Sequence, residues 1–441
     1  MRMANDKMKV IVGLGKTGLS CARFLASRNE KFRVVDTRQN PPGLQQLKTE
    51  CPEFEAELGP FNEETFMNAA QLIVSPGVDQ QMPVLRKAID SGLPVTGDVD
   101  MFAREVQAPV IAITGSNAKS TVTTLVGEMA RAGGLNVSVA GNIGLPVLDA
   151  LMQQPASLYV LELSSFQLET TSDLGAEVAS VLNMSLDHMD RYDSMQAYRN
   201  AKHRIFEACR QAVINDDDPM SSAELPEDVK QWHFSFEQES AEFNVSKGFI
   251  AFNDSPLMPV SALRIPGSHN VANALAALAL GHAAGFSMSA MLNTLRTFEG
   301  LPHRCQWVAD REGVNWYNDS KGTNVGACIA AINGLAGKGR IILLAGGQGK
   351  DADFSALNDP LSAHSKLAIL FGEDAALIKE AIEHSVVTLI VSSMEEAVSL
   401  ADEKADAGDV VLLSPACASF DMFSNFEERG DVFTQCVREL H

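Results

Sequence analysis

The segment at residues 110–121 constrains the fold of this chain most strongly. Its sequence, VIAITGSNAKST, joins an apolar run to a turn of small residues that ends in Lys119, Ser120 and Thr121. A buried strand, such a turn and a following helix place backbone N–H groups and a helix N-terminus where they can bind phosphate. A lysine and a hydroxyl at this position typically contact nucleotide phosphates and Mg²⁺. The segment therefore predicts a site for ATP or GTP in an α/β domain.

The match to the common phosphate-loop pattern G-x-x-x-x-G-K-[ST] is incomplete. Ile113 and Ala118 occupy the positions where that pattern has glycine. We therefore expect Gly115 to make the turn. The alternative interpretation is an ordinary strand-to-helix junction whose lysine is solvated.

Composition limits the classes of function. A chain of 441 residues is long enough for about two to four domains. The formal net charge of −21 argues against a broad surface for nucleic acid or an anionic membrane. Seven cysteines without C-x-x-C spacing indicate neither a disulfide framework nor a zinc site. With no signal-peptide core and no apolar run long enough to span a membrane, we expect a cytoplasmic protein without membrane insertion.

Apolar runs and turn residues divide the chain into three α/β parts, which we place at residues 1–97, 98–302 and 303–441. Residues 219–259 alternate between polar and apolar, which predicts an antiparallel segment. The expected helices include residues 15–27 and a buried, alanine-rich helix at residues 271–285. One expected strand begins at residue 110. The other expected strands cover residues 9–14, 32–36, 71–75, 136–140, 158–163, 178–184, 340–345, 367–371 and 410–414.

A glycine-rich turn follows the first expected strand. Gly13, Gly15 and Gly18 have the spacing G-x-G-x-x-G, and Asp36 ends the next strand. This pattern is typical of a dinucleotide site, with the glycines at a diphosphate and the acid on a ribose or base. The residues alone leave three interpretations open: NAD, another diphosphate ligand, or glycines that serve only tight packing.

Two polar segments follow apolar strands of the middle part. Glu162 lies at the end of the run LYVLE, and a carboxylate at that edge of a parallel sheet is well placed to hold Mg²⁺ on nucleotide phosphates. Residues 183–192 contain Asp187, His188 and further charges, and we expect a site role for His188. Lys202 is ambiguous by itself, because most lysines in such a helix are exposed.

Three turns of small residues follow strands in the last part, at residues 318–324, 346–350 and 414–420. Each brings hydroxyl groups or a cation to the carboxyl end of a strand. Together they predict a second ligand surface, suited to a substrate that carries a carboxylate. The alternative is that the three turns are unrelated.

The series of motifs resembles the Mur ligase family of peptidoglycan synthesis along all three parts. The matching segments are, in order, TGSNAKST, GNIG, LELSSFQL, DHMDRY, HNxxN, LPHR, NDSKGTN and GGxxK. The resemblance implies a Rossmann-like N-terminal domain, a central P-loop-type ATP-binding α/β domain and a C-terminal Rossmann-like α/β domain. It also implies a ligase that uses ATP and Mg²⁺ to phosphorylate the carboxylate of UDP-N-acetylmuramoyl-L-alanine. D-glutamate then attacks the acyl phosphate, and a tetrahedral intermediate collapses to an amide.

The resemblance assigns roles to residues that match the motifs of the family. ATP is expected at Gly115, Ser116, Asn117, Ala118, Lys119, Ser120, Thr121, Asn270, Asn273, Arg304 and Asp319. The UDP-linked substrate is expected at Gly15, Lys16, Thr17, Gly18, Asp36, Thr37, Arg38, Ser75, Pro76, Gly77, Asn142, Ser164 and Gln167. D-glutamate is expected at Lys321, Thr323, Lys350, Ser419, Phe420 and Phe426. Catalytic roles are expected for Lys119, Asn142, His188 and Lys202.

Two Mg²⁺ ions are expected from the same resemblance, held by Ser120, Glu162, His188 and Lys202, the last as a carbamate. Because the family commonly has glycine where this chain has Ala118, we expect that position 118 need not adopt positive φ. We also expect a monomer. A related ligase for another amino acid or for folates, and an NAD-binding protein, are the alternative functions.

Overall fold

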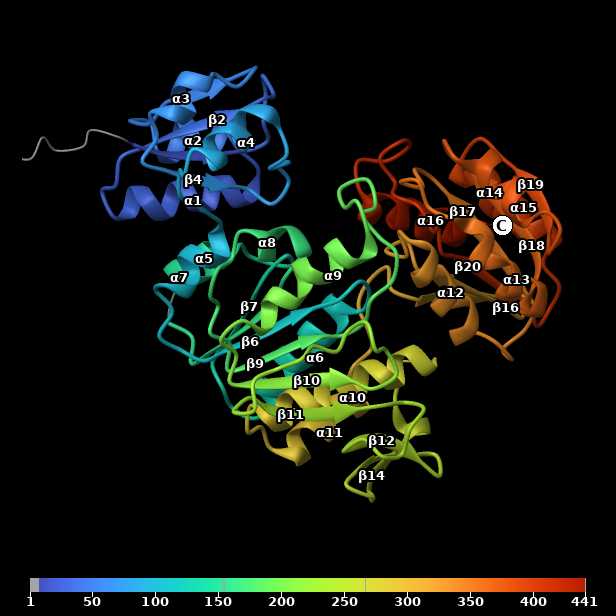
Figure 1. Ribbon diagram of the computed structural model, residues 1–441. Helices are drawn as coiled ribbons and strands as arrows, with labels where there is room; N and C mark the ends of the chain where they lie inside the picture. Colours follow the sequence, from blue (N-terminus) through green and yellow to red (C-terminus); the bar gives the residue numbers. More distant parts are fainter. Residues whose placement is uncertain (1–7, 154, 266, 441) are drawn as a thin grey trace, which may run out of the picture. The chain divides into compact units, whose positions relative to one another are not determined.

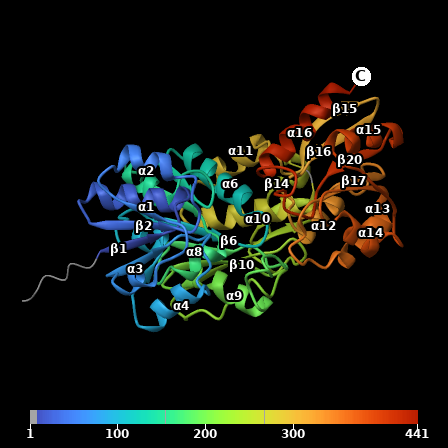
Figure 2. The same ribbon diagram turned by 90° about the horizontal axis from the view of Figure 1, so that it is seen from above.

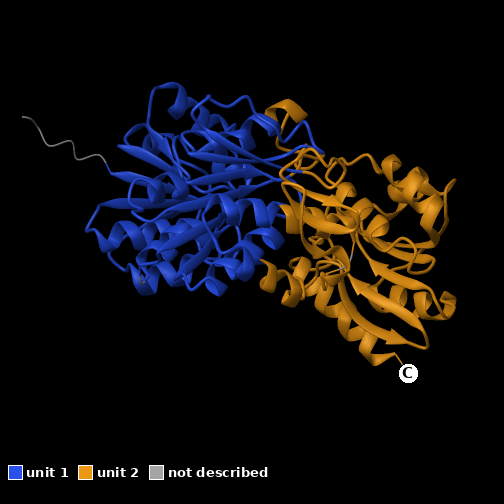
Figure 3. Cartoon of the chain, turned by 90° about the horizontal axis from the view of Figure 1, so that it is seen from below, with its two compact units in different colours: residues 1–182, 198–234, 276–291 blue, residues 183–197, 235–275, 292–441 orange. Residues whose placement is uncertain are grey.

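The computed structural model of the chain describes residues 8–153, 155–265 and 267–440. The chain divides into two compact units (Figure 3). Unit 1 contains residues 1–182, 198–234 and 276–291, and unit 2 contains residues 183–197, 235–275 and 292–441.

The first sheet of unit 1 is built from the N-terminal part of the chain (Figure 1). Its strand order is β3-β2-β1-β4-β5, and neighbouring strands are parallel. Its strands are β1 Lys9–Val12, β2 Phe32–Asp36, β3 Ala56–Leu58, β4 Gln71–Val74 and β5 Val95–Thr96. Its helices are α1 Lys16–Ser27, α2 Leu44–Glu50, α3 Glu63–Met67 and α4 Pro83–Asp90. Because β1 and β4 are parallel neighbours, the glycine turn after β1 meets Ser75 after β4 at one edge of the sheet.

The second sheet of unit 1 has the parallel strand order β11-β10-β9-β6-β8-β7. Its strands are β6 Val110–Thr114, β7 Val137–Gly141, β8 Leu158–Glu162, β9 Val178–Val181, β10 Gln211–Asn215 and β11 Lys230–Phe234. Every residue of β6, β8 and β9 is buried, as is typical of parallel strands covered on both faces. The helices of this part are α5 Asp98–Ala103, α6 Lys119–Ala132, α7 Val147–Met152 and α8 Ser165–Glu169.

Three further helices contain residues of both units: α9 Met195–His203, α10 Ser268–Ala283 and α11 Met288–Thr297. Helix α10 corresponds to the alanine-rich helix predicted from the sequence. No helix in the described part of the chain is long and apolar enough to cross a membrane.

Unit 2 contains an antiparallel meander and a mixed sheet (Figure 2). The meander consists of β12 Phe243–Ser246, β13 Phe249–Phe252 and β14 Ser255–Pro259. The mixed sheet has the order β15-β16-β20-β17-β18-β19, in which the β15–β16 pair is antiparallel and the other pairs are parallel. Its strands are β15 Gln306–Arg311, β16 Val314–Asn318, β17 Ile341–Gly346, β18 Ser365–Phe371, β19 Val387–Ile390 and β20 Val410–Leu413.

Helices cover both faces of the mixed sheet. The helices are α12 Val325–Gly334, α13 Asn358–His364, α14 Ala375–Ile382, α15 Met394–Lys404 and α16 Phe426–Glu439. Residues of α12, α13 and α14 pack in one apolar core, and residues of α15 and α16 pack in the other. The α/β class and the strands predicted from the apolar runs are confirmed, with strand ends shifted by up to three residues.

The antiparallel segment predicted for residues 219–259 is only partly correct. Residues 243–259 form the antiparallel meander, but β11 pairs with β10 in parallel, with Gln211 opposite Lys230. Residues 216–229 separate these two strands, and a connection of this length permits the crossover that parallel pairing requires. The polar and apolar alternation of β11 did not distinguish the two arrangements.

Candidate active site

The turn after β6 has the backbone geometry of a phosphate-binding loop. Gly115 has a φ of +153°, and Ala118, which precedes α6, has a φ of +64°. The expectation that position 118 need not adopt positive φ is therefore wrong. The loop requires the left-handed conformation at the start of the helix, and alanine adopts it at a cost of about 1 kcal/mol relative to glycine.

Lys119 is the first residue of α6 and its ammonium group lies over the turn. Its Nζ donates to the carbonyl oxygens of Gly115 at 2.8 Å and Ser116 at 2.9 Å. Ser120 and Thr121 follow in the first helical turn, where their side chains are buried. The side chain of the lysine thus stays close to the backbone N–H groups that would contact phosphate.

Glu162 ends β8, the strand next to β6, and lies opposite Ile113. Its Oε1 accepts a hydrogen bond from Asn142 Nδ2 at 2.7 Å, and its carbonyl oxygen accepts one from the Asn142 N–H at 2.8 Å. Its Oε2 is buried and accepts no hydrogen bond from a described residue. Since a buried carboxylate oxygen without a partner is unfavourable, this atom fits a ligand for Mg²⁺.

The protein side chains alone do not form a complete metal cage. Among the described residues, no group of three or more His, Cys, Asp and Glu side chains is arranged to hold a metal ion. Mg²⁺ usually takes only one or two protein carboxylates and completes its ligands with phosphate oxygens and water. The donor set around Glu162 is therefore compatible with Mg²⁺ that arrives with a nucleotide.

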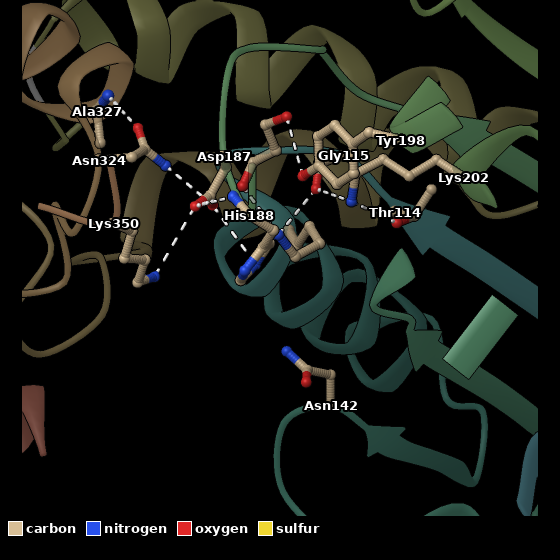
Figure 4. Close-up of polar contacts among 12 residues, drawn as sticks. Thr114, Gly115, Asn142, Asp187, His188, Tyr198, Lys202, Asn324, Ala327 and Lys350 are labelled. Carbon is tan, nitrogen blue, oxygen red and sulfur yellow. Dashed lines mark hydrogen bonds and ion pairs between the residues drawn. The ribbon is translucent and has the colours of Figure 1, made fainter. Parts of the chain in front are cut away.

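Lys202 is a buried cation on α9, with a relative exposure of 1%. Its Nζ donates to the Gly115 carbonyl oxygen at 2.8 Å and lies 3.5 Å from Thr114 Oγ1 (Figure 4). It also lies 4.7 Å from the centre of the Tyr198 ring, whose hydroxyl is 3.3 Å from Ser116 Oγ. The sequence left Lys202 ambiguous, and the fold brings it to the phosphate turn.

Ser164 is the N-cap residue of α8, and it forms a capping box with Gln167, the third residue of the helix. The Gln167 N–H donates to Ser164 Oγ at 3.2 Å. Gln167 Oε1 accepts from the Ser164 N–H at 3.1 Å and from the Ser164 hydroxyl at 3.2 Å. These hydrogen bonds fix the side chains of Ser164 and Gln167 relative to each other. Ser164 lies two positions after Glu162 in the chain.

The N-terminal glycine turn is tightly packed. Gly13 has a φ of +92°, and a Cβ on Gly18 would lie 1.9 Å from the Gly13 carbonyl oxygen, so no larger residue fits there. Ser75 Oγ donates to the same oxygen at 3.0 Å. The remaining predicted positions of this edge are Gly15, Lys16, Thr17, Thr37, Arg38, Pro76 and Gly77, which are exposed or half-buried.

Asp36 is engaged by the chain itself. Its Oδ2 accepts from the Leu14 N–H at 2.7 Å, and its Oδ1 accepts from the Arg38 N–H and Nε, each at 2.9 Å. Burial raises the pKa of Asp36, but these hydrogen bonds outweigh it and hold the pKa below its usual value. The carboxylate thus fixes the glycine turn, a role that the dinucleotide pattern did not predict.

In unit 2, Asp187 and His188 form a strained turn. His188 has a φ of +59°, and its N–H donates to Asp187 Oδ1 at 3.0 Å. Asn324 Nδ2 donates to Asp187 Oδ2 at 3.3 Å, and Lys350 Nζ lies 3.9 Å from Asp187 Oδ1 (Figure 4). The acidic cluster at residues 183–192 therefore contacts two of the turns predicted to form the second ligand surface.

The fold brings the three turns of unit 2 together at one edge of the mixed sheet. They follow β16, β20 and β17, which are consecutive in the strand order. Gln348 and Ala418 exchange backbone hydrogen bonds, and the Ala416 N–H donates to the Gly322 carbonyl oxygen. The interpretation of the turns as unrelated is therefore wrong.

The side chains predicted on this surface differ in their environment. Lys321 Nζ lies 4.0 Å from the centre of the Phe426 ring, a cation–π distance. Ser419 is buried, whereas Phe420 is 69% exposed. Thr323 and Lys350 complete the predicted set, and both are half-buried.

Arg429 was not predicted from the sequence, although it holds the three turns together. Its guanidinium is fully buried and donates to Ser320 Oγ and the Ser320 carbonyl oxygen at 3.0 and 2.8 Å. It also donates to the carbonyl oxygens of Cys417, Ala418 and Gly346 at 3.1 to 3.4 Å. Burial lowers the pKa of Arg429 to about 10. In the sequence it looks like any surface arginine near the start of a charged helix.

Four residues predicted around the adenine, ribose and phosphates of ATP lie in unit 2: Asn270, Asn273, Arg304 and Asp319. On α10, Asn273 Nδ2 donates to Asn270 Oδ1 at 3.1 Å. Asp319 accepts from the Cys305 N–H at 3.0 Å and from the Ser414 hydroxyl at 2.7 Å. Burial raises the pKa of Asp319 to about 7, although these hydrogen bonds and the charge of Arg304 favour the carboxylate.

Family models match three successive parts of the chain. They are described as Mur ligase MurD-like, N-terminal domain (residues 7–97), Mur ligase middle domain (residues 113–281) and Mur ligase, glutamate ligase domain (residues 303–417).

Relatives resemble the chain over its full length. It is 52% identical over 446 residues to UDP-N-acetylmuramoylalanine--D-glutamate ligase of Pseudomonas syringae pv. tomato, covering 99% of both chains. It is 49% identical over 444 residues to the ligase of the same name from Coxiella burnetii, covering 99% of this chain and 100% of that one. The solved UDP-N-acetylmuramate-alanine ligase of Thermotoga maritima matches with a TM-score of 0.61 at 16% identity, over 98% of this chain and 99% of that one. That likeness shows a common fold.

Proposed function

Because the chain belongs to the Mur ligase family, we propose that it joins D-glutamate to UDP-N-acetylmuramoyl-L-alanine at the expense of ATP. The observation that carries this proposal is the sequence identity of 52%, over 99% of both chains, to a UDP-N-acetylmuramoylalanine--D-glutamate ligase. The reaction is a step of peptidoglycan precursor synthesis, and we place it in the cytoplasm. We also place the domain boundaries at residues 97/98 and 302/303.

The first step activates the terminal carboxylate of the UDP-linked substrate. A carboxylate oxygen attacks the γ-phosphorus of ATP, and the bond from this phosphorus to the β,γ-bridging oxygen breaks. The products are an acyl phosphate and ADP. Both reactants are anions, so the site must compensate their charge. Lys119, whose ammonium lies over the phosphate turn, would contact the phosphates during transfer. The turn residues Gly115, Ser116, Asn117, Ala118, Ser120 and Thr121 would bind them through N–H groups and hydroxyls.

Mg²⁺ would supply charge neutralisation on the transferred phosphoryl group. Ser120 and Glu162 would hold one ion, and the orphaned Oε2 of Glu162 supports this assignment. His188 and Lys202 would hold a second ion, with Lys202 as a carbamate. Asn142 orients Glu162 through its 2.7 Å hydrogen bond and would also contact the substrate.

The second step forms the amide. The amine of D-glutamate attacks the acyl carbon, and the tetrahedral intermediate expels inorganic phosphate. Two cations, Lys321 and Lys350, would bind the two carboxylates of the amino acid. Thr323, Ser419, Phe420 and Phe426 would complete this site. The residues Asn270, Asn273, Arg304 and Asp319 would lie around the adenine, ribose and phosphates of ATP.

The UDP-linked substrate would be bound at two places in unit 1. Gly15, Lys16, Thr17, Gly18, Asp36, Thr37, Arg38, Ser75, Pro76 and Gly77 would bind its nucleotide. Asn142, Ser164 and Gln167 would bind its muramoyl part. The diphosphate interpretation of the glycine turn is supported by the match of residues 7–97 to the N-terminal domain of the family. The close packing at Gly18 and the hydrogen bond from the Leu14 N–H to Asp36 are compatible with it.

Phosphate release from Mg-ATP tests this function. With UDP-N-acetylmuramoyl-L-alanine present, release is expected with D-glutamate and not with L-glutamate, D-aspartate, L-lysine or meso-diaminopimelate. Omission of any one substrate should abolish it. Release with another amino acid would reassign the substrate within the family, and release with a folate acceptor would support a folylpolyglutamate-type ligase. Tight binding of NADH in a fluorescence titration would instead support an NAD-binding protein.

The carbamate on Lys202 is a separate prediction. Lysine reacts with CO₂ only as the neutral amine, and burial of a lysine favours that form. Activity is expected to fall in CO₂-depleted buffer and to recover with bicarbonate. Protein equilibrated with carbon-13 bicarbonate should show a carbamate resonance by NMR that is lost in Lys202→Ala and kept in Lys230→Ala, a control at an exposed lysine. A Lys202→Ala protein of normal activity would contradict the assignment.

A further inference from the structure

Arg204 is a half-buried cation to which the proposed chemistry gives no task. It begins a short 3₁₀ helix, η1 Arg204–Phe206, which directly follows α9. Lys202 lies two positions earlier, near the end of α9. Ile205 and Phe206 are buried, so η1 is packed into the fold at this point. A shift of η1 would therefore move the end of α9 that carries Lys202.

The guanidinium of Arg204 binds the C-terminal end of α8. Its Nε donates to the Leu168 carbonyl oxygen at 2.8 Å, and its Nη2 donates to the Thr171 carbonyl oxygen at 2.5 Å. Carbonyl groups at a helix C-terminus carry partial negative charge, so a cation is favourable there. The Glu207 carboxylate, which follows η1 in the chain, lies 3.9 Å from the guanidinium. The two hydrogen bonds to carbonyl groups thus join η1 to α8.

Helix α8 is itself fixed to the phosphate turn. The Leu163 N–H, just before the helix, donates to the Ile113 carbonyl oxygen at 2.9 Å. The Leu163 carbonyl oxygen accepts from Thr114 Oγ1 at 2.6 Å. At the other end of the helix, Thr171 Oγ1 donates to the Gln167 carbonyl oxygen at 2.8 Å. The guanidinium therefore binds a helix whose position relative to the phosphate turn is set by hydrogen bonds.

Lys202 closes this set of contacts at the phosphate turn (Figure 4). Its Nζ donates to the Gly115 carbonyl oxygen at 2.8 Å and lies 4.7 Å from the centre of the Tyr198 ring. Hydrogen bonds thus link the turn to α8, α8 to Arg204, and the segment of Arg204 back to the turn through Lys202. The place of the Lys202 ammonium depends on the link in the middle.

A second arginine anchors α9 to another part of unit 1. Arg199 Nε donates to the Met220 carbonyl oxygen at 2.9 Å, and its Nη2 donates to the Ser222 carbonyl oxygen at 2.5 Å. These acceptors belong to the connection between β10 and β11, which carries no predicted site residue. Arg199 and Arg204 therefore make the same kind of contact, but the contact of Arg204 leads to the predicted active site.

We propose that Arg204 is a positioning residue for Lys202: by binding the C-terminal carbonyl groups of α8, it keeps the Lys202 side chain at the phosphate turn. This inference rests on the proposed function, because it takes Lys202 as the carbamate that serves phosphoryl transfer. Without the guanidinium, the end of α9 can move relative to α8. The Lys202 nitrogen then loses the fixed place in which it reacts with CO₂ and faces the phosphates.

The first measurement is the occupancy of the carbamate. Wild-type protein and Arg204→Ala are titrated with carbon-13 bicarbonate at one pH, and the carbamate resonance is followed by NMR. Arg204→Ala should need about five times more bicarbonate for half of the maximal resonance, as expected for the loss of hydrogen bonds that hold the segment. Its kcat in ambient CO₂ should fall about tenfold. The KM for each substrate should change less than twofold, because the capping box at the start of α8 is kept.

Arg199→Ala is the matched control, since it also removes one positive charge and hydrogen bonds to two carbonyl groups. Both variants should lower Tm by similar amounts, but Arg199→Ala should keep the wild-type bicarbonate curve and kcat. Added guanidinium ion, at a concentration that does not denature the protein, should restore kcat in Arg204→Ala. Arg204→Lys should show a smaller shift of the same kind, because a single ammonium does not reproduce the planar fork of the guanidinium. It carries the test if Arg204→Ala does not fold.

Each outcome decides the inference. Bicarbonate curves of the Arg204 variants that coincide with the wild-type curve would overturn it, as would an equal shift in Arg199→Ala, which would indicate general loosening of α9. A wild-type protein with D-glutamate-dependent phosphate release but no carbamate resonance would overturn the inference and leave the ligase function intact. A shifted curve in Arg204→Ala, found together with a wild-type protein that does not use D-glutamate, would support the positioning role and overturn the proposed function.

Discussion

Replacement of Lys119 by alanine is expected to lower kcat for ATP-dependent ligation by about three orders of magnitude. The ammonium group is held over the phosphate turn by the carbonyl oxygens of Gly115 and Ser116, at 2.8 and 2.9 Å. In this position it can follow the negative charge that moves from the nucleotide to the acyl phosphate. Preorganised charges of this kind act mainly on the transition state, so kcat should fall more than KM rises.

The measurement for Lys119→Ala is single-turnover formation of ADP with all substrates saturating. Lys48→Ala, at an exposed lysine on α2, serves as the control for loss of a positive charge and should have wild-type kinetics. Lys119→Arg should recover only part of the activity, because a planar guanidinium does not replace a compact ammonium in a tight turn. A kcat for Lys119→Ala within tenfold of the wild type would show that this turn does not bind the reacting phosphates.

Much of this arrangement could be predicted from local sequence. One example is the segment at residues 110–121, in which the apolar strand, the glycine turn and Lys119 follow one another directly in the sequence. A pattern of adjacent residues can be recognised without knowledge of the fold. The same holds for the turns that follow β16, β17 and β20. Their meeting at one edge follows from the strand order, which the sequence does not contain as a local pattern.

What escaped prediction depends on contacts distant in the sequence. Arg429 is separated by 109 positions from Ser320, whose hydroxyl and carbonyl oxygens accept its hydrogen bonds. The predicted contact of Asp36 with a ligand stays a prediction, but its hydrogen bonds to the Leu14 N–H and to the Arg38 side chain were not visible in the sequence. A carboxylate after a strand looks the same in sequence whether it binds a ligand or the neighbouring backbone.

Ala118 shows that a residue preference can also mislead. Alanine disfavours positive φ, so its presence argued for a different loop conformation, yet its φ is +64°. The loop is fixed by the strand before it and the helix after it, and these contacts exceed the local preference of about 1 kcal/mol. Local strain of this kind is found where function determines the backbone conformation.

The second large effect is expected for Glu162→Gln, which should lower kcat by about two orders of magnitude and raise the Mg²⁺ concentration needed for half-maximal activity. Glutamine has nearly the same shape and can still accept the hydrogen bond from Asn142. It removes the negative charge from the buried Oε2, which accepts no hydrogen bond from the described part of the chain. Because the substitution removes an unpaired buried charge, the Tm of the Glu162→Gln protein should not fall below that of the wild type.

Magnesium titration of ligase activity at saturating ATP distinguishes this role from a structural one. Glu169→Gln, at the end of α8, removes a carboxylate of similar size that accepts a hydrogen bond from Gln80, and its magnesium curve should match that of the wild type. The Kd of the UDP-linked substrate without metal should also be unchanged in Glu162→Gln, since Asn142 and Ser164 keep their positions. If Glu162→Gln retained the wild-type magnesium curve, the orphaned oxygen would have to be explained by bound water, and the ion would have to be held by other groups. The shift in the magnesium curve therefore tests whether β8 places its terminal carboxylate beside the phosphate turn for metal binding.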